Sequence, residues 1–184
     1  MLGRFDKSRV LASDVAYFAP ELSTLKLDVK LQGTINGTVS HLRAKSLVIE
    51  PNKGTVLKGD FEIKGLPLIK NTVFTLNLRE LKTSKKEYDQ LLRNITGNTR
   101  NDLAEEIAQL GNFSYSGSFK GFSNDFKMQG TLQTELGKVN IKTLTFKRNA
   151  QREPVYEASV QTDQFNIGKL LNKSELGSIN FDGD

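Results

Sequence analysis

The sequence predicts a mainly β protein built from a repetitive antiparallel sheet with a few short helices. Three observations support this fold class: apolar and polar residues alternate over many short segments, Gly- and Asn-rich breaks separate those segments, and parts of the pattern recur along the chain. Alternation with a period of two places apolar side chains on one face of a strand and polar ones on the other. Strands with one wet face are typical of antiparallel sheets.

The clearest strand is predicted over residues 25–35, where Leu27, Val29 and Leu31 share a face. The same alternation recurs in four further segments, and their apolar members are Phe61 and Ile63, then Phe74, Leu76 and Leu78, then Phe113 and Tyr115, then Val139 and Ile141. Breaks at residues 36–37, 52–54 and 121–124 are expected to be turns. Most Gly residues are interpreted as turn residues at strand ends.

Short helices are expected to interrupt the strands. One is predicted over residues 13–18, where Ser13 acts as the N-cap and Pro20 ends it. Ser84 and Glu87 form a capping-box pattern for a helix that ends at Gly97. The Ala- and Glu-rich residues 103–110 predict another helix, and Asp163 is expected to cap a last helical turn through residues 167–171.

Internal repeats organise the chain. Gly33 and Gly37 are matched by Gly117 and Gly121, which lie 84 residues later in both cases, and residues 110–117 match residues 176–183 at an offset of 66. Four units are predicted. Residues 1–24 are the end of a preceding repeat with its short helix, and residues 25–110 are the first repeat, with strands and then a helical insert. Residues 111–175 are the second repeat, and residues 176–184 are the start of a third. The last residues stop within an alternating pattern, so we expect an interior segment of a longer protein.

No residue pattern predicts an enzyme, a cofactor site or a metal site. The chain has no Cys, its one histidine is His41, and no phosphate-binding glycine loop is present. The net charge of +5 is spread along the chain, which favours a solvated face, with attraction to an anionic membrane surface as the second interpretation. Nucleic-acid binding is disfavoured because the aromatic residues alternate with aliphatic ones. No apolar run is long enough to span a bilayer.

The pattern alone leaves the architecture open. One-faced alternation is also the pattern of an ordinary β-sandwich core, which the alternation by itself favours over a single exposed sheet. In a sandwich the apolar residues would be closed off from solvent, whereas a single curled sheet would leave them open to it.

Several motifs in order resemble the repeating module of the TamB/AsmA-like translocation and assembly module family, in its Bacteroidetes-type form. They are residues 13–22 followed by the first strand with Gly33 and Gly37, residues 58–61 with 65–67, residues 119–126, residues 130–137 and residues 165–171. The resemblance implies an interior segment of a long protein that is anchored in the inner membrane and crosses the bacterial periplasm. It also implies a sheet curled into an open trough, the β-taco. Together with the repeats, it favours the trough over the sandwich.

The resemblance further implies an apolar groove that carries phospholipid acyl chains between inner and outer membrane, or assists outer-membrane protein assembly, or both. The full-length protein is expected to pair with a BamA/TamA-type outer-membrane barrel. The predicted groove lining is Leu27, Val29, Leu31, Phe61, Ile63, Phe74, Leu76, Leu78, Phe113, Tyr115, Val139 and Ile141. The alternative is a structural β-spacer or a protein-binding module with a closed apolar core. An isolated segment is expected to self-associate through the groove or the sheet edges.

Overall fold

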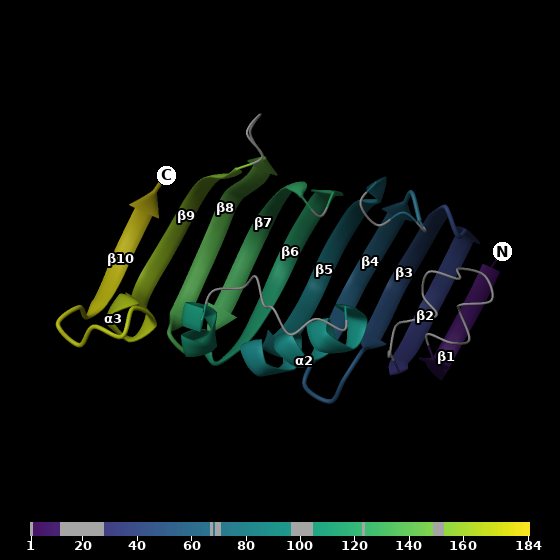
Figure 1. Cartoon of the computed structure of the whole chain (residues 1–184), viewed down its shortest axis with the longest axis horizontal. Coiled ribbons are helices and arrows are strands. Elements are labelled where there is room, and N and C mark those ends of the chain that lie inside the picture. Colours follow the sequence, from purple (N-terminus) through teal and green to yellow (C-terminus); the bar gives the residue numbers. More distant parts are fainter. Residues whose placement is uncertain are drawn as a thin grey trace.

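The chain forms one open sheet of ten antiparallel strands that follow one another in sequence order (Figure 1). The computed structural model describes residues 2–11, 28–66, 68, 71–96, 105–122, 124–148 and 153–184. Strands make up 72% of the structure, and the sheet is not closed into a barrel. The predicted fold class, a repetitive antiparallel sheet curled into an open trough with a few short helices, is therefore confirmed.

The strands range from 6 residues in β10 to 13 residues in β9. They are β1 (Leu2–Leu11), β2 (Asp28–Thr38), β3 (His41–Glu50), β4 (Val56–Lys64), β5 (Val73–Ser84), β6 (Asn112–Phe122), β7 (Asp125–Thr134), β8 (Gly137–Arg148), β9 (Pro154–Asn166) and β10 (Ser178–Gly183). With neighbouring strands about 4.8 Å apart, ten strands span about 43 Å across the sheet. Such a sheet offers a long continuous face on each side.

Three short helical segments lie in the connections at one end of the strands (Figure 1). They are α2 (Lys85–Thr96) and the 3-10 helix η3 (Glu105–Leu110), both between β5 and β6, and α3 (Ile167–Leu170), between β9 and β10. We call this the helical end. The opposite end carries the connections β2–β3, β4–β5, β6–β7 and β8–β9, and we call it the hairpin end.

The helix predictions have mixed outcomes. The Ser84 hydroxyl accepts a hydrogen bond from the Glu87 backbone N–H at 3.3 Å, as a capping box requires, and α2 begins at the next residue. Residues 105–110 form a 3-10 helix, whereas the helix over residues 13–18 lies outside the described residues. The Asp163 cap is wrong: β9 continues to Asn166, whose side chain accepts from the Lys169 N–H at 2.8 Å. Asn166 is therefore the cap of α3.

The residues that match each other in the sequence lie four strands apart in the sheet. Gly33 and Gly37 lie in β2, and their matches Gly117 and Gly121 lie in β6, four strands further along the sheet. The second match pairs β6 with β10, which is again four strands away. Strands β2–β5 are followed by α2, and strands β6–β9 are followed by α3. The two connections differ in length, because α2 and η3 lie between β5 and β6 whereas only the shorter α3 lies between β9 and β10.

The sheet bends along a line of glycines and irregular residues that crosses the middle of the strands. Gly117 and Gly130 face each other in β6 and β7 with φ of 156° and 152°. A Cβ on Gly130 would lie 2.2 Å from the Ser116 carbonyl oxygen. Register shifts interrupt the neighbouring pairings at the same level, and Ser46 has a positive φ at one of them. Bulges and glycines of this kind are what curve a sheet.

These mid-strand glycines correct the interpretation of Gly as a turn residue. Gly33, Gly59, Gly117 and Gly130 lie inside strands, and Gly37 and Gly121 also precede the ends of theirs. Close approach of the neighbouring backbone explains several of them, because an added Cβ at Gly59 would lie 2.3 Å from the Asn77 carbonyl oxygen. They shape the sheet rather than end its strands.

The two faces differ in polarity. The outer face carries cross-strand ion pairs, including Lys30–Glu50 at 4.0 Å, Lys58–Glu80 at 2.6 Å and Lys147–Glu157 at 2.8 Å. Each exposed pair adds little to stability. Together they indicate that this face is exposed to solvent, because a second sheet packed on it would have to bury their charges. The opposite face carries the apolar members of the alternation.

Candidate functional site

The apolar face is built from four rows of residues that run across the sheet from β2 to β9. The first row, nearest the hairpin end, contains Gly37, Leu42, Ile63, Phe74, Gly121, Phe126, Phe146 and Tyr156. The second contains Ile35, Ala44, Phe61, Leu76, Phe119, Met128, Leu144 and Ala158. In each row the members are direct cross-strand partners, so their side chains lie beside one another.

The other two rows lie nearer the helical end. The third, at the level of the bend, contains Leu47, Gly59, Leu78, Gly117, Gly130, Ile141 and Val160, with Gly33 beside Leu47. The fourth contains Leu31, Ile49, Leu57, Leu81, Tyr115, Leu132, Val139 and Thr162. At each bulge the strand register shifts, and the alternation of apolar and polar residues then resumes with its apolar members on the same face. That face is therefore apolar on both sides of the bend.

The structure places eleven of the twelve predicted lining residues on this one face. Leu31, Phe61, Ile63, Phe74, Leu76, Leu78, Tyr115, Val139 and Ile141 belong to the four rows. Val29, opposite Val10, and Phe113, opposite Thr83, extend the face toward the helical end. Leu27 lies outside the described residues. The alternation therefore brought residues of five separate strands onto a common surface.

Other residues of the face were missed by the sequence prediction. Leu42, Leu47, Ile49, Leu57, Leu81, Phe119, Phe126, Met128, Leu132, Leu144, Phe146, Tyr156 and Val160 contribute as much to the rows as the predicted residues do. Bulges hide several of them, because Leu78 and Leu81 lie on one face although three positions apart. Phe119 and Phe126 could have been added to the predicted lining, since both lie in the sequence motifs that resemble the TamB module.

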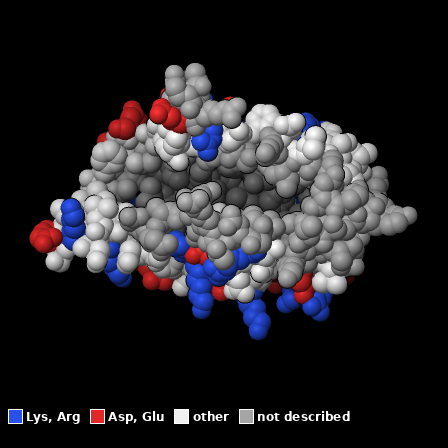
Figure 2. All heavy atoms as spheres, viewed as in Figure 1, with Lys and Arg blue, Asp and Glu red and all other residues white. Residues whose placement is uncertain are grey.

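Most of the apolar face is only partly buried. A contiguous cluster of Ala44, Leu47, Phe61, Leu78, Tyr115 and Ile141 is buried, and eleven further apolar residues that pack against it are partly buried. Among the described residues, the strands pack mainly against their neighbours in the sheet, and no second sheet covers the face. Figure 2 shows a hollow in the middle of this view, with the charged side chains around its margins.

The accessible surface has the size expected of an open sheet. The chain exposes 12130 Å². A compact monomer of 20.5 kDa would expose about 8,900 Å² by the usual scaling with mass. The excess of roughly a third is consistent with a face that no second layer closes.

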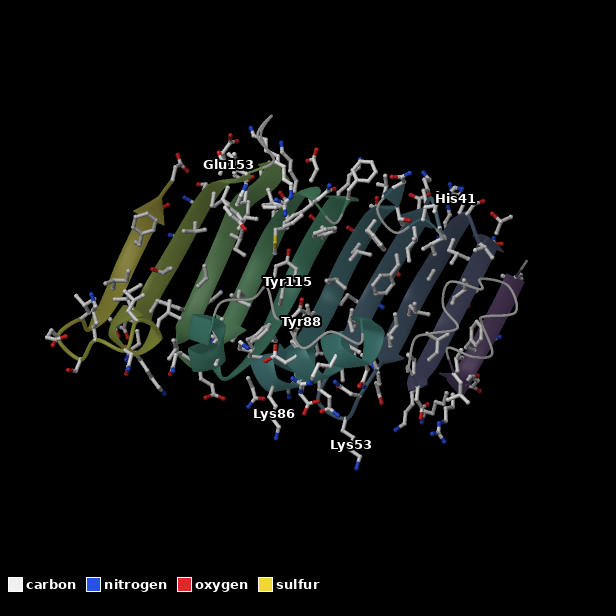
Figure 3. The ribbon with its side chains drawn as sticks, viewed as in Figure 1. His41, Lys53, Lys86, Tyr88, Tyr115 and Glu153 are labelled. Carbon is white, nitrogen blue, oxygen red and sulfur yellow. The ribbon has the colours of Figure 1, made fainter. Side chains whose placement is uncertain are left out.

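Tyr115 stabilises the bend from the apolar side. The residue is 5% exposed, and its hydroxyl donates to the Gln129 carbonyl oxygen at 2.7 Å, with the Ser118 carbonyl oxygen 3.1 Å away as a second, shared acceptor. The hydroxyl lies 2.6 Å from where a Cβ on Gly117 would be, so the tyrosine occupies the space that this glycine leaves. Burial raises the pKa of Tyr115. Figure 3 shows Tyr115 over the middle of the sheet.

Four aromatic rings form a tier at the hairpin end of strands β6 to β9. We call Phe119, Phe126, Phe146 and Tyr156 the aromatic tier. Their ring centroids are 4.9 Å apart for Phe119–Phe126, 5.2 Å for Phe126–Phe146 and 5.0 Å for Phe146–Tyr156. Phe146 is buried, whereas Tyr156 is 66% exposed. The tier therefore leads from the interior of the apolar face out to solvent.

The helical end is lined by packed polar and apolar groups. The hydroxyls of Thr55 and Thr83 are hydrogen-bonded at 2.8 Å, and both residues are buried. Lys85, at the start of α2, is 6% exposed and pairs with Asp89 at 2.7 Å. Between α2 and α3, the Leu136 carbonyl accepts from the Asn166 N–H at 2.8 Å. This end is therefore more closed than the hairpin end.

The outer face carries a polar depression of about 420 Å³ beside the bulge at Arg79 and Glu80. Lys58, Ser114, Thr131 and Gln133 also border it. All three of its charged groups are already paired, because Lys58 contacts Glu80 at 2.6 Å and Arg79 contacts Asp60 at 3.7 Å. Apart from the buried Tyr115, the depression is lined by polar and charged surface residues, so it does not point to a particular ligand.

Charge concentrates at one place on the outer face, near the hairpin end. Glu62 accepts hydrogen bonds from His41 at 2.7 Å and Arg43 at 2.9 Å, and Lys64 lies 3.1 Å away. These three partners lower the pKa of Glu62 to about 2, with the His41 hydrogen bond as the largest cause. The cluster links β3 to β4 and is a structural ion-pair network. Within the described residues, no group of three or more His, Cys, Asp or Glu could hold a metal ion.

Comparison with known proteins adds no assignment. No family model matches the chain, and neither the curated proteins nor the solved structures contain a significant match to it. None of the described helices is long and apolar enough to cross a membrane.

Proposed function

We propose that the apolar face binds the acyl chains of phospholipids, and that the chain is a periplasmic segment of a TamB/AsmA-like protein. The observation that carries the proposal is the continuity of the face: four rows of apolar residues cross eight strands without a charged residue between them until the hairpin end. In such a protein the segment extends a path for lipid between inner and outer membrane, or supports outer-membrane protein assembly with a BamA/TamA-type barrel.

The physical chemistry of acyl chains supports this assignment. Removing one CH₂ group from water contributes about 0.8 kcal/mol, so affinity comes from apolar contact along the chain and no specific pocket is needed. Partly buried side chains such as Leu57, Leu132 and Val139 still expose apolar surface that a bound acyl chain can cover. The wet outer face, with its cross-strand ion pairs, keeps the opposite side in solvent.

A structural spacer or protein-binding module with a closed core is the second candidate. The contiguous buried cluster favours this candidate, since its members, among them Ala44 and Ile141, are already shielded from solvent without any ligand. If the two sides of the bend close further on each other, the partly buried residues of the four rows become an ordinary core. The surface area of 12130 Å² argues against this closure as the resting state.

Lipid co-purification tests the proposal. The protein is exported to a bacterial periplasm, purified without detergent, and analysed by native mass spectrometry with lipid extraction. Bound phospholipid is expected in the wild type, and Val29→Asp should reduce it while circular dichroism stays unchanged. Lys30→Gln, which changes the next residue on the outer face, is the matched control and should retain the lipid. A lipid-free, folded wild-type monomer would contradict the proposal.

A further inference from the structure

The two outermost strands leave the sheet with two open edges. Among the described residues, β1 and β10 are the strands that pair on one side only, and they lie at opposite ends of the sheet (Figure 1). An edge strand presents backbone N–H and C=O groups that readily pair with a further strand. Neither strand contains a proline, which would prevent such pairing at its own position. Both edges are therefore able to accept another strand.

The edge at β10 exposes apolar side chains whose counterparts inside the sheet are covered. Phe181 pairs with Thr162 and so continues the fourth row onto β10. It matches Tyr115 of β6 in the sequence repeat. Tyr115 lies in a strand that is paired on both sides and is 5% exposed, whereas Phe181 is 43% exposed. Ile179, two positions earlier, is 39% exposed. A strand beside β10 would cover this apolar surface, which favours its pairing.

The two edges carry opposite charges. Strand β1 contains one acidic residue, Asp6, and three basic ones, Arg4, Lys7 and Arg9. Residues 174–184, which include β10, contain no basic residue and three acidic ones, Glu175, Asp182 and Asp184. Like charges on facing strands are destabilising. Pairing β1 with a second β1, or β10 with a second β10, would bring like charges together, whereas pairing β1 with β10 brings opposite charges together.

The strand directions allow this pairing between two copies of the chain. Neighbouring strands are antiparallel throughout the ten-stranded sheet, so β1 and β10 run in opposite directions. A second copy placed in the same orientation beside β10 therefore presents its β1 in the antiparallel direction. Its apolar face then lies on the same side as that of the first copy.

The register fits because β10 repeats the sequence pattern of β2, with which β1 already pairs. Phe5 lies opposite Gly33, which corresponds to Gly183 through the two sequence matches. The residue after Gly33 lies opposite Arg4, and its counterpart in β10 is Asp184. Arg4 and Asp184 are both exposed. If β1 repeats this register on the edge of β10, these two side chains become direct cross-strand neighbours, close enough for an ion pair.

From these observations we infer that copies of this chain associate head to tail, with β10 of one copy paired with β1 of the next and Arg4 paired with Asp184 across the junction. Different surfaces of the two copies meet, so assembly continues without a fixed stoichiometry unless a ring closes. One strand pair is a small interface, so the association is expected to be weak and reversible. The junction joins the apolar faces of successive copies. The inference does not rest on lipid binding.

Sedimentation velocity over a range of protein concentrations tests the inference. Wild type in low salt should form progressively larger species as the concentration rises, and high salt should shift them toward monomer. Arg4→Glu and Asp184→Lys should each raise the apparent dissociation constant by about fivefold, because like charges replace an exposed ion pair. The double variant Arg4→Glu/Asp184→Lys places opposite charges across the junction again, so it should recover most of the association.

Lys45→Glu is the matched control. It changes the net charge as much as Arg4→Glu does, but Lys45 is an exposed residue of β3, which is paired on both sides. This variant should associate like wild type, and circular dichroism should show the same fold for every variant. Wild type that stays monomeric at all concentrations would overturn the inference, and so would association that neither edge variant weakens.

The remaining outcomes identify other modes of association. An equal loss in Lys45→Glu would overturn the inference in favour of general charge attraction. Weakening by only one of the two edge variants, or no recovery in the double variant, would overturn it in favour of pairing between like edges. Lipid co-purification is measured separately, so each of these outcomes leaves the proposed function to its own test.

Discussion

A charge placed on the apolar face distinguishes an open trough from a closed core. Val139 lies in the fourth row between Leu132 and Thr162, and its side chain is partly buried. Full burial of a valine side chain contributes about 1.5–3 kcal/mol, so a partly buried one contributes about 1–2 kcal/mol. In an open trough, Val139→Asp lowers the free energy of unfolding by that amount, because the new carboxylate stays in contact with water. In a closed core the same substitution buries a charge and costs several kcal/mol more.

Urea unfolding followed by circular dichroism measures the difference. For a slope of about 2 kcal/mol per molar urea, a loss of about 1–2 kcal/mol lowers the midpoint by about 0.5–1 M. Asn140→Asp, at the next position on the outer face, is the control and should leave the midpoint almost unchanged. Bound phospholipid should be lost from Val139→Asp and kept by Asn140→Asp. A stability loss of about 4 kcal/mol or more in Val139→Asp alone would refute the open trough.

Three further predictions follow from the bend and the outer face. Gly130→Ala should destabilise the fold by about 1–3 kcal/mol, because of its positive φ and the 2.2 Å approach to a carbonyl oxygen, while Gly177→Ala, with open space around it, should not. Tyr115→Phe should lower the free energy of unfolding by about 1 kcal/mol in urea titrations. The lowered pKa of Glu62 stabilises the fold above about pH 4.5, and this contribution is lost as the pH falls toward about 2. Acid titration of Glu62→Gln should therefore show a weaker loss of stability than wild type over that range.

Sequence alternation predicted the face of each residue where strands are regular. In β5, Phe74, Leu76 and Leu78 follow a strict period of two, and all three face the same side. The same holds for Val139 and Ile141 in β8. Period two is a local property of any strand, so it survives without knowledge of the partner strands. The fold class was predictable for this reason.

The bulges were not predictable, because they depend on pairing between strands. Ser46 adopts a φ of 51° in the middle of β3, although nothing in its sequence neighbourhood requires it. The two residues between Leu78 and Leu81 interrupt the period of two. The sequence alone therefore does not show that Leu81 lies on the same face as Leu78. The false Asp163 cap has the same origin, since β9 passes through a bulge and continues to Asn166.

The aromatic tier required tertiary information of another kind. Phe126, Phe146 and Tyr156 come from three strands, and only the register reveals that they are consecutive cross-strand partners. The location of the tier is therefore a property of the assembled sheet.

Fluorescence quenching by brominated acyl chains tests most directly whether lipid lies on the apolar face. The chain contains no tryptophan, so a single introduced one reports on its own position. Leu144→Trp places the probe in the second row, and Thr145→Trp places it at the adjacent position on the outer face. With phospholipid brominated on its acyl chains, the fluorescence of Leu144→Trp should be quenched and that of Thr145→Trp should not. Equal quenching of both, or none in Leu144→Trp, would contradict an apolar face that binds lipid.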